Sequence, residues 1–280
     1  MPVIALTQGM GSLAQDVAEQ LAAELGLATL QHEVGERVAD RMHVSKSLIN
    51  RLREGKAGTI ERLKADSDSL AVYTAEEVLD AAVRGNVVLR GWGATQLLRQ
   101  VPHVVCVRIA RPLELRVDWL MEHLGIDERE VAQAEIRRSD HAHAARMNEL
   151  FGVTWLDPLL FDMVLNTDRL SVDACVQQIR QLVERPEFAQ TPASRALLAG
   201  LAQNAKVRSA LRADEATRDV DVTIESGTQE GRLRLRGVVV NNAERDAAFR
   251  VAAGVAGVTG VDSELRVMAP SRRFPSAGGS

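Results

Sequence analysis

Glycine turns that join short apolar runs to helical patterns constrain the fold of this chain most strongly. Residues 3–6 form an apolar run long enough for a short buried strand, and Gly9 and Gly11 follow it before a stretch with helical spacing. The pattern recurs at 86–89, followed by Gly91 and Gly93, and at 104–109, where Pro112 precedes the helical stretch. Strands that alternate with helices predict a parallel sheet whose two faces are both covered by helices.

Helical patterns dominate the residues between and after these strands. Residues 32–84 form a helical insertion between the first two predicted strands. A helix is expected over 113–124 and a long polar helix over 127–150. A last strand is predicted over 160–165, so the first part of the chain has α/β organisation.

The periodicity changes after a stretch of prolines and short polar residues at 186–195. Apolar residues then alternate with polar ones in short segments, which predicts strands with one buried face. The expected order is helix, strand, strand, helix and strand, over 197–211, 220–224, 232–236, 243–255 and 261–267. This αββαβ order predicts a small α+β layer with one polar sheet face.

We therefore expect two domains. An α/β domain covers 1–185, a linker covers 186–195, a small α+β domain covers 196–268, and a disordered tail covers 269–280. The length of 280 residues agrees with two domains at roughly 150 residues each.

Composition excludes several classes of protein. With 46% apolar and 26% charged residues the chain is an ordinary globular protein. Nine aromatic residues are too few for a platform that stacks single-stranded nucleic acid. No apolar run approaches the roughly 18 residues of a membrane span, and no basic region precedes the first apolar stretch, so we expect a cytoplasmic protein. Cys106 and Cys175 show no metal-ligand spacing and are expected to be buried thiols.

Charge is distributed unevenly along the chain. Residues 1–185 carry a balance of −6 and residues 186–280 a balance of +2. A surface that binds duplex nucleic acid needs a clustered positive field. Neither part has the charge expected of a general nucleic-acid binder.

The turn after the first strand is placed where phosphate binds, because glycines let the backbone approach and the first N–H groups of a helix are unpaired. The phosphate-loop consensus is Gly, four residues, Gly, Lys and Ser or Thr. Aligned with it, this chain keeps Gly9 but has Ala14, Gln15 and Asp16 in the last three positions. The carboxylate of Asp16 can ligate Mg²⁺ or interact with the positive end of the helix. A turn without a ligand is the alternative.

Motifs further along extend this weak match. They are Gly-Met-Gly-Ser at 9–12, residues 86–94, residues 112–117, Ser139-Asp140, residues 151–155 and residues 157–167. Their order resembles that of the cytidylate kinase-like family of nucleoside monophosphate kinases over 1–185. The resemblance implies a P-loop kinase-like core, an acceptor site in the helical insertion, a lid on the long helix, and an ATP- or CMP-like nucleotide with Mg²⁺.

The same resemblance assigns individual residues. It carries Gly9, Gly11 and Ser12 over as phosphate-loop positions, Arg116 as the arginine after the third strand, and Asp140 as the lid aspartate.

Several positions depart from the family pattern. Gln15 stands where the family has a basic residue, Gln31 where it has an acidic one, and Trp92 where it has an arginine between two glycines. His143 and Ala145 stand where it has lid arginines. Phosphoryl transfer depends on positioning and charge neutralisation, so the loss of these cations predicts a degenerate kinase. Trp92 can stack on a base, fill the vacated site or pack in the core.

The long helix also carries Arg137, Arg138 and Arg146. They either replace part of the lost charge or form a solvated helix face. His141 and His143 are two residues apart and so point apart on a helix, and we expect no metal site.

Residues 37–58 offer a rival interpretation, because they also look like a repressor-type helix-turn-helix. Ser45 would cap a recognition helix whose basic and polar residues reach bases and phosphates: Lys46, Ser47, Asn50, Arg51 and Arg53. The acidic surroundings argue against DNA as the partner.

The last 70 residues or so resemble the BON domain over 196–268, and Gly237 and Gly257 match its glycine positions. The resemblance implies attachment to phospholipid or to another macromolecule, without catalytic residues. Strand alternation places Arg232, Arg234 and Arg236 on one sheet face, and Arg266 joins them from the last strand. This face binds lipid phosphates or an acidic ligand, or is a solvated outer face.

Our leading hypothesis is a catalytically impaired kinase-like protein that binds a nucleotide or other phosphorylated small molecule and reports it through the BON-like domain. It would be a sensor or adaptor with a protein or phospholipid partner. The alternatives are an active nucleoside monophosphate kinase, an interaction scaffold and a DNA-binding regulator. The oligomeric state is left open.

Overall fold

The computed structural model describes residues 1–30, 32–58, 61, 66–227 and 231–268. Gln31 and the expected tail 269–280 lie outside the described residues. The chain divides into two compact units, Met1–Ala205 and Lys206–Ser280, which we describe one at a time.

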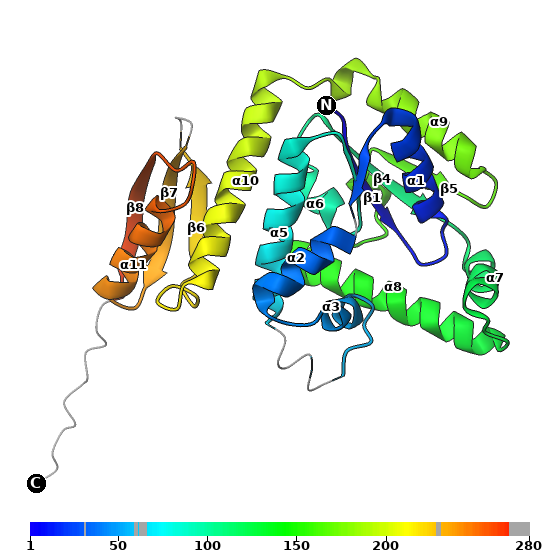
Figure 1. Ribbon diagram of the computed structural model, residues 1–280, viewed down its shortest axis with the longest axis horizontal. Helices are drawn as coiled ribbons and strands as arrows, with labels where there is room; N and C mark the ends of the chain where they lie inside the picture. The colour runs from blue at the N-terminus through cyan, green and yellow to red at the C-terminus, as the bar shows by residue number, and fades with distance from the viewer. Residues whose placement is uncertain (31, 59–60, 62–65, 228–230, 269–280) are drawn as a thin grey trace, which may run out of the picture. The chain divides into compact units, whose positions relative to one another are not determined.

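The first unit is built on a parallel five-stranded sheet (Figure 1). The strands are β1 (Val3–Gln8), β2 (Ala28–Leu30), β3 (Val87–Arg90), β4 (Val104–Ala110) and β5 (Met163–Asn166). Their order is β2-β3-β1-β4-β5, so the expected parallel sheet is confirmed. The edge strand β2 was not predicted, because its three partly or fully exposed residues are too few to show a period.

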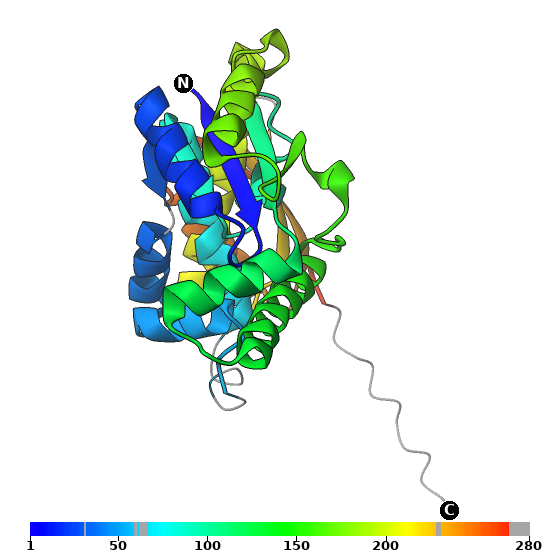
Figure 2. The ribbon, with the colours of Figure 1, turned by 90° about the vertical axis from the view of Figure 1, so that its right-hand side faces the viewer.

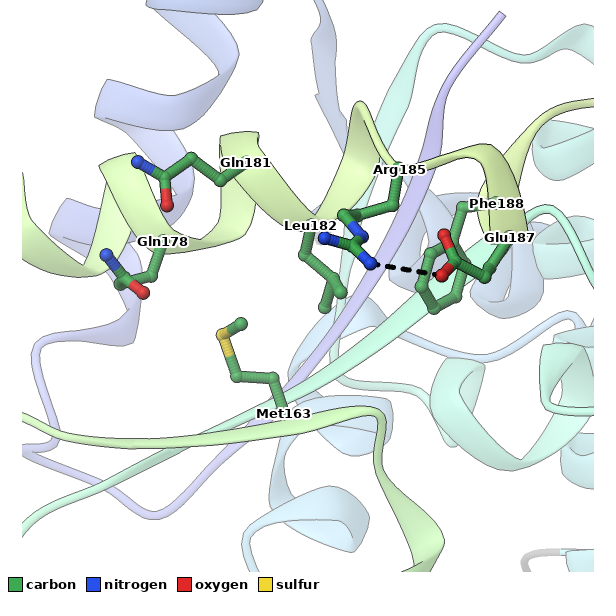
Figure 3. Close-up of a pocket in the computed structure, with 7 residues that line it drawn as sticks. All are labelled: Met163, Gln178, Gln181, Leu182, Arg185, Glu187 and Phe188. Carbon is green, nitrogen blue, oxygen red and sulfur yellow. Dashed lines mark hydrogen bonds and ion pairs between the residues drawn. The ribbon is translucent and has the colours of Figure 1, made fainter.

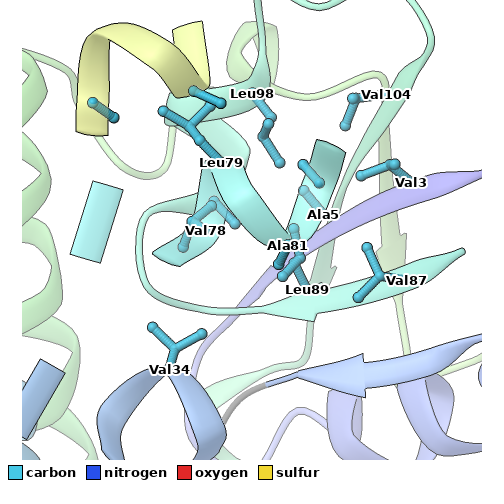
Figure 4. Packing of buried hydrophobic residues seen from close by; sticks show 14 of the residues in the cluster. Val3, Ala5, Val34, Val78, Leu79, Ala81, Val87, Leu89, Leu98 and Val104 are labelled. Atoms are coloured by element: carbon cyan, nitrogen blue, oxygen red, sulfur yellow. The ribbon is translucent and has the colours of Figure 1, made fainter. Parts of the chain in front are cut away.

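Helices cover both faces of this sheet. On one face α1 (Ala14–Leu25) and α9 (Val172–Val183) share a core with the strands that includes Ile4, Leu6 and Ile109. On the other face lie α2 (His32–Met42), α5 (Ser67–Arg84), α6 (Ala94–Leu98) and the first part of α10 (Pro192–Ala213). Figure 4 shows aliphatic side chains of this second core, which also buries Tyr73.

Three more helices and two 3₁₀ turns of this unit lie within the described residues. Helix α3 (Lys46–Arg53) follows α2, and η1 (Pro158–Leu160) and η2 (Pro186–Phe188) are the 3₁₀ turns. Helices α7 (Leu113–Leu124) and α8 (Arg129–Phe151) pack on each other through Val117, Leu120, Ala132 and Ile136. Figure 2 shows both beside the loop that follows β1, and Met10 of that loop packs against their shared core.

The second unit contains a three-stranded sheet in the order β6-β7-β8. Strands β6 (Val222–Ser226) and β7 (Arg232–Val239) are antiparallel, and β8 (Gly260–Val267) runs parallel to β7. The end of α10 and α11 (Asn242–Ala253) supply the helical side of its core. The expected αββαβ order is confirmed.

Some boundaries differ from those expected. Helix α10 begins at Pro192, so residues 192–195 of the expected linker are helical, because a proline is well tolerated in the first turn of a helix. The strand expected from residue 160 begins at Met163, after η1. We retain the division into 1–185, 186–195 and 196–268 as a proposal.

No helix in the part of the chain that the structure describes is long and apolar enough to cross a membrane.

Both cysteines are buried, Cys106 in β4 and Cys175 in α9. Burial raises the pKa of Cys106 to about 12, and burial also raises the pKa of Cys175. Because the thiolate is the reactive form, we expect iodoacetamide at pH 8 to leave both thiols of the folded protein unmodified. Mass spectrometry of native and urea-unfolded samples checks this, and the unfolded sample should be alkylated at both. Rapid alkylation of the native protein would contradict the burial.

Candidate functional site

The loop between β1 and α1 forms the predicted phosphate-binding turn. Gly11 has a φ of +76°, and Leu13, which precedes the first helical residue, has a φ of +61°. The N–H of Ser12 donates to the carbonyl of Gly9 at 3.3 Å and closes the turn. The first amides of α1 have no partner within the helix, so this end of the helix attracts an anion.

Arg116 of α7 lies directly against this loop. Its Nε donates to the carbonyl of Met10 at 2.7 Å, and its two terminal nitrogens donate to the carboxylate of Asp140 at 2.9 and 2.7 Å. A Cβ on Gly9 would lie 2.8 Å from the guanidinium carbon of Arg116, so a larger residue there would displace the guanidinium. The structure thus brings two predicted residues to the loop and ties α7 to α8.

Ser12 is 2% exposed, and its side chain has an unused hydroxyl. Its carbonyl accepts a hydrogen bond from Oγ1 of Thr167 at 2.9 Å, but its own Oγ bonds no described residue. The buried Oε1 of Gln8, one residue before Gly9, is likewise unpaired among the described residues. Buried polar groups are almost always hydrogen-bonded, so these two atoms fit a polar ligand at the loop.

Three arginines near the loop were not among the predicted site residues. Arg90 ends β3, Arg108 lies in β4, and Arg111 follows β4 and donates to the carbonyl of Gly11 at 3.4 Å. Burial lowers the pKa of Arg90 and of Arg108. The signal in the sequence was an arginine at or just after the end of two apolar runs, 86–89 and 104–109, because the carboxyl ends of parallel strands meet at one sheet edge.

Gln15 and Asp16 occupy the exposed first turn of α1. The amide nitrogen of Gln15 donates to Glu19 at 2.8 Å, and its oxygen accepts from Arg90 at 3.3 Å. The position of the consensus lysine is therefore filled by a neutral side chain that contacts a cation from another element.

The predicted lid residue His143 packs on an aromatic ring. Its imidazole centre lies 4.2 Å from the ring centre of Trp155. The indole of Trp155 donates to Oγ1 of Thr7 in β1 at 3.2 Å, and the guanidinium of Arg108 lies 5.1 Å from the same indole ring. His143 is thus linked by packing to the strand that leads into the loop.

The other two tryptophans also lie close to site segments. A Cβ on Gly11 would lie 3.2 Å from Trp119, and one on Gly35 of α2 would lie 3.0 Å from Trp92. Trp92 is half-buried and packs against the core beneath α2, which is the packing alternative of the three expected for it.

The remaining arginines of α8 point elsewhere. Arg137 is exposed and forms no ion pair within the described part of the chain. Arg138 pairs with Glu135 on the same helix. Arg146 donates to the carbonyl of Leu52 at 2.6 Å, and burial lowers its pKa. None of the three hydrogen-bonds a described residue of the loop.

The helix-turn-helix-like segment has the expected cap but no uncommitted cations on its described side chains. Oγ of Ser45 accepts from the N–H of Leu48 at 3.2 Å and caps α3. Lys46 pairs with Glu36 and Arg51 pairs with Glu61. Cations held by carboxylates are poorly placed to bind phosphates, which weakens the DNA interpretation.

The arginines of β7 share one face of the second unit's sheet, as expected, but carboxylates share that face. Arg232 pairs with Asp262 at 2.9 Å, and Arg234 lies 3.2 Å from Glu264. Arg236 pairs with Glu264 at 2.7 Å and with Glu225 at 3.2 Å. Arg266 is exposed on β8 two residues after Glu264. The face is a ladder of alternating charge rather than a purely basic surface.

A groove of about 440 Å³ lies apart from the loop, beside β5 and the end of α9 (Figure 3). It is lined by Met163, Gln178, Gln181, Leu182, Arg185, Glu187 and Phe188. An ion pair of 3.1 Å joins Arg185 to Glu187 at its edge. None of the predicted site residues lines it. No group of three or more His, Cys, Asp or Glu side chains that could hold a metal occurs within the described ranges.

Residues 3–169 match the model of a family described as the cytidylate kinase-like family, and residues 202–269 match the BON domain. A cytidylate kinase of Ignicoccus hospitalis is 29% identical over 65% of this chain and 99% of its own length. A cytidylate kinase of Staphylothermus marinus is 24% identical over 57% of this chain and 91% of its own length.

Among solved structures, an uncharacterized protein from Eubacterium ventriosum resembles 66% of this chain and all of its own chain. The TM-score is 0.51 at 18% sequence identity. At this identity the likeness describes the fold alone.

Proposed function

Because this chain belongs to the cytidylate kinase-like family and continues into a BON domain, we propose that its first unit binds a nucleotide at the loop 8–16 and is impaired in phosphoryl transfer. The site residues that we assign to the ligand are Gly9, Gly11, Ser12, Gln15, Asp16 and Arg116. Asp140, Arg137 and His143 are assigned to the lid. Asp16 is our candidate ligand for the Mg²⁺ that accompanies the nucleotide.

The charge around the loop carries this proposal. Phosphoryl transfer requires cations that neutralise the transferred group. The loop itself contributes Gln15 instead of a lysine, and the guanidinium of Arg116 is already held by Asp140 and by the carbonyl of Met10. Loop amides and the unused Oγ of Ser12 support binding of a phosphate, whereas the neutral residue 15 argues for slow transfer.

We further propose that the second unit reports the bound state to a protein or phospholipid partner. Its arginine ladder supports an electrostatic contact, in which a phosphate would displace Asp262 or Glu264 from the arginines of β7. The protein would then act as a sensor or adaptor.

An active nucleoside monophosphate kinase is the second candidate. The observation in its favour is the set of arginines at the carboxyl ends of β3 and β4, namely Arg90, Arg108 and Arg111. These cations could replace those missing from the loop and the lid.

Calorimetry and an activity assay separate the two candidates. ATP, CTP and CMP are titrated with and without Mg²⁺, and a coupled assay follows ADP formation from ATP and CMP. Binding without turnover supports the impaired protein. Turnover that is abolished in Gly11→Val supports the active kinase and overturns impairment. If none of the nucleotides binds, the interaction scaffold becomes the better description.

Gly11→Ala is expected to abolish nucleotide binding. The new Cβ would lie 3.0 Å from the carbonyl of Arg116 and 3.2 Å from Trp119, at a φ of +76° that costs an L-residue about 1–2 kcal/mol. Gly26→Ala is the matched control, because Gly26 has a φ of +66° but no atom within 4 Å of its added Cβ. Calorimetry of both variants checks the prediction. Equal losses in the two variants would show that backbone strain, and not the loop, is responsible.

A further inference from the structure

We propose that Arg90 supplies the cation that binds the phosphate chain of the ligand, in place of a lysine in the loop, and that Gln15 positions its guanidinium. This inference rests on the proposed function, since it assigns a phosphate-binding residue within the same site. It identifies the recognised chemistry as a chain of two or more phosphates.

The backbone directs Arg90 toward the loop. Side chains alternate along β3, so Arg90 lies on the same face as Val88, which packs in the core shared with α1. From the carboxyl end of β3 its Nη2 reaches Oε1 of Gln15 at 3.3 Å, in the first turn of α1. The guanidinium therefore lies next to the helix end that follows the phosphate loop.

Glu19 fixes the direction in which the Gln15 amide points. The carboxylate of Glu19 only accepts hydrogen bonds, so it holds the amide nitrogen of Gln15 at 2.8 Å and turns the oxygen toward Arg90. A lysine at position 15 would instead place a second cation beside this guanidinium. The side chains at positions 15 and 90 are thus matched to each other by this hydrogen bond.

The charge of Arg90 is not cancelled by a carboxylate. Within the described ranges Arg90 forms no ion pair, whereas Arg37, Arg41 and Arg51 of the same unit each pair with a glutamate. Glu19 and Asp16 attract Arg90 only from a distance, and burial lowers its pKa. A partly buried cation without a counter-ion is costly, and a bound anion removes that cost.

A second observation points to a ligand at the same loop. Oγ of Ser12, in the loop that precedes the first turn of α1, is buried and has no partner among the described residues. A phosphate at the start of α1 would accept from this hydroxyl and from the guanidinium together.

The test uses the full chain and titrates inorganic pyrophosphate and ATP by calorimetry. Arg90→Gln is expected to raise the Kd of both probes about ten- to a hundredfold, the range for losing a hydrogen bond to a charged group. Arg84→Gln is the matched control, because Arg84 precedes β3, is exposed and pairs with Asp80. It should bind both probes like the wild type. Arg90→Lys keeps the charge and should recover part of the affinity.

A double-mutant cycle tests whether the side chains at positions 15 and 90 are coupled in ligand binding. Gln15→Lys should tighten pyrophosphate binding about tenfold in the Arg90→Gln background, where no arginine lies beside the new ammonium. In the wild type it should tighten binding less than about threefold, because Arg90 repels the new ammonium. Additive effects would overturn the pairing of the two residues. Unchanged binding in folded Arg90→Gln would overturn this inference and leave the proposed function intact. Failure of the wild type to bind any nucleotide or pyrophosphate would overturn both.

Discussion

Replacing Arg116 with methionine is expected to lower the free energy of unfolding of the first unit by about 3 kcal/mol. Arg116 is 8% exposed in the structure, and its guanidinium makes three hydrogen bonds, one to the carbonyl of Met10 and two to Asp140. Methionine preserves most of the side-chain volume but leaves the carboxylate of Asp140 and the loop carbonyl without their donor. Removing one partner of a buried ion pair costs more than the pair contributes, because the other charge stays behind.

Arg129→Met is the matched control for this substitution. Arg129 also joins α8 to α7, through ion pairs with Glu114 and Asp118, but its side chain is 46% exposed. Exposed ion pairs contribute little, so this variant should unfold at nearly the wild-type denaturant concentration. Urea unfolding followed by circular dichroism compares the two variants. If Arg116→Met were as stable as Arg129→Met, the buried pair would not hold the loop to α7 and α8.

A double variant tests whether the unpaired carboxylate of Asp140 causes the loss of stability in Arg116→Met. The double variant Arg116→Met/Asp140→Asn removes both charges, and it should recover part of the stability that Arg116→Met loses. Recovery would identify the stranded carboxylate as the source of the loss. A double variant less stable than either single variant would instead point to packing around α7.

Replacing Leu235 with alanine is expected to destabilise the second unit by about 3–4 kcal/mol. Leu235 is fully buried at the centre of β7, among Val207, Ile224 and Leu265. A unit of this size has a small core, so a loss of this order is a large part of its total stability. We therefore expect much of the second unit to be unfolded in this variant.

Val238→Ala is the matched control. It tests whether the loss of stability in Leu235→Ala comes from the burial of Leu235 rather than from its place in β7. Val238 lies on the opposite face of β7 and is 55% exposed, so its truncation should change stability little. Hydrogen exchange read by mass spectrometry resolves peptides of the second unit from those of the first. Fast exchange of β6, β7 and β8 in Leu235→Ala alone is the expected result, and equal exchange in both variants would contradict it.

The spacing of apolar residues in the sequence predicted much of the fold. The helix expected over 113–124 is observed with the same bounds, and the strand and glycine turn at the start of the chain lie where they were placed. Strand β2 was missed because three residues cannot show an alternation, and its pairing with β3 is a tertiary interaction. The start of α10 was placed five residues too late because prolines and polar residues at 186–195 were interpreted as a linker.

The pairings within the site were not predictable from one sequence. Arg116 and Asp140 were both assigned from resemblance, but their bond joins residues 24 positions apart on two helices. Arg90 and Gln15 are 75 positions apart and meet only because β3 lies beside β1 in the sheet. In the second unit the shared face of the arginines followed from alternation, whereas Asp262 and Glu264 reach them through the register of β7 with β8.

The distribution of tryptophan has an optical consequence. All three tryptophans belong to the first unit, where Trp92 lies against α2, Trp119 against Gly11 and Trp155 against β1. Residues 206–280 contain neither tryptophan nor tyrosine. Indole emission from the intact protein therefore originates entirely from the first unit. Changes in its emission wavelength or intensity report on the kinase-like unit without an attached dye. Structural changes confined to the BON domain leave the tryptophan fluorescence unchanged.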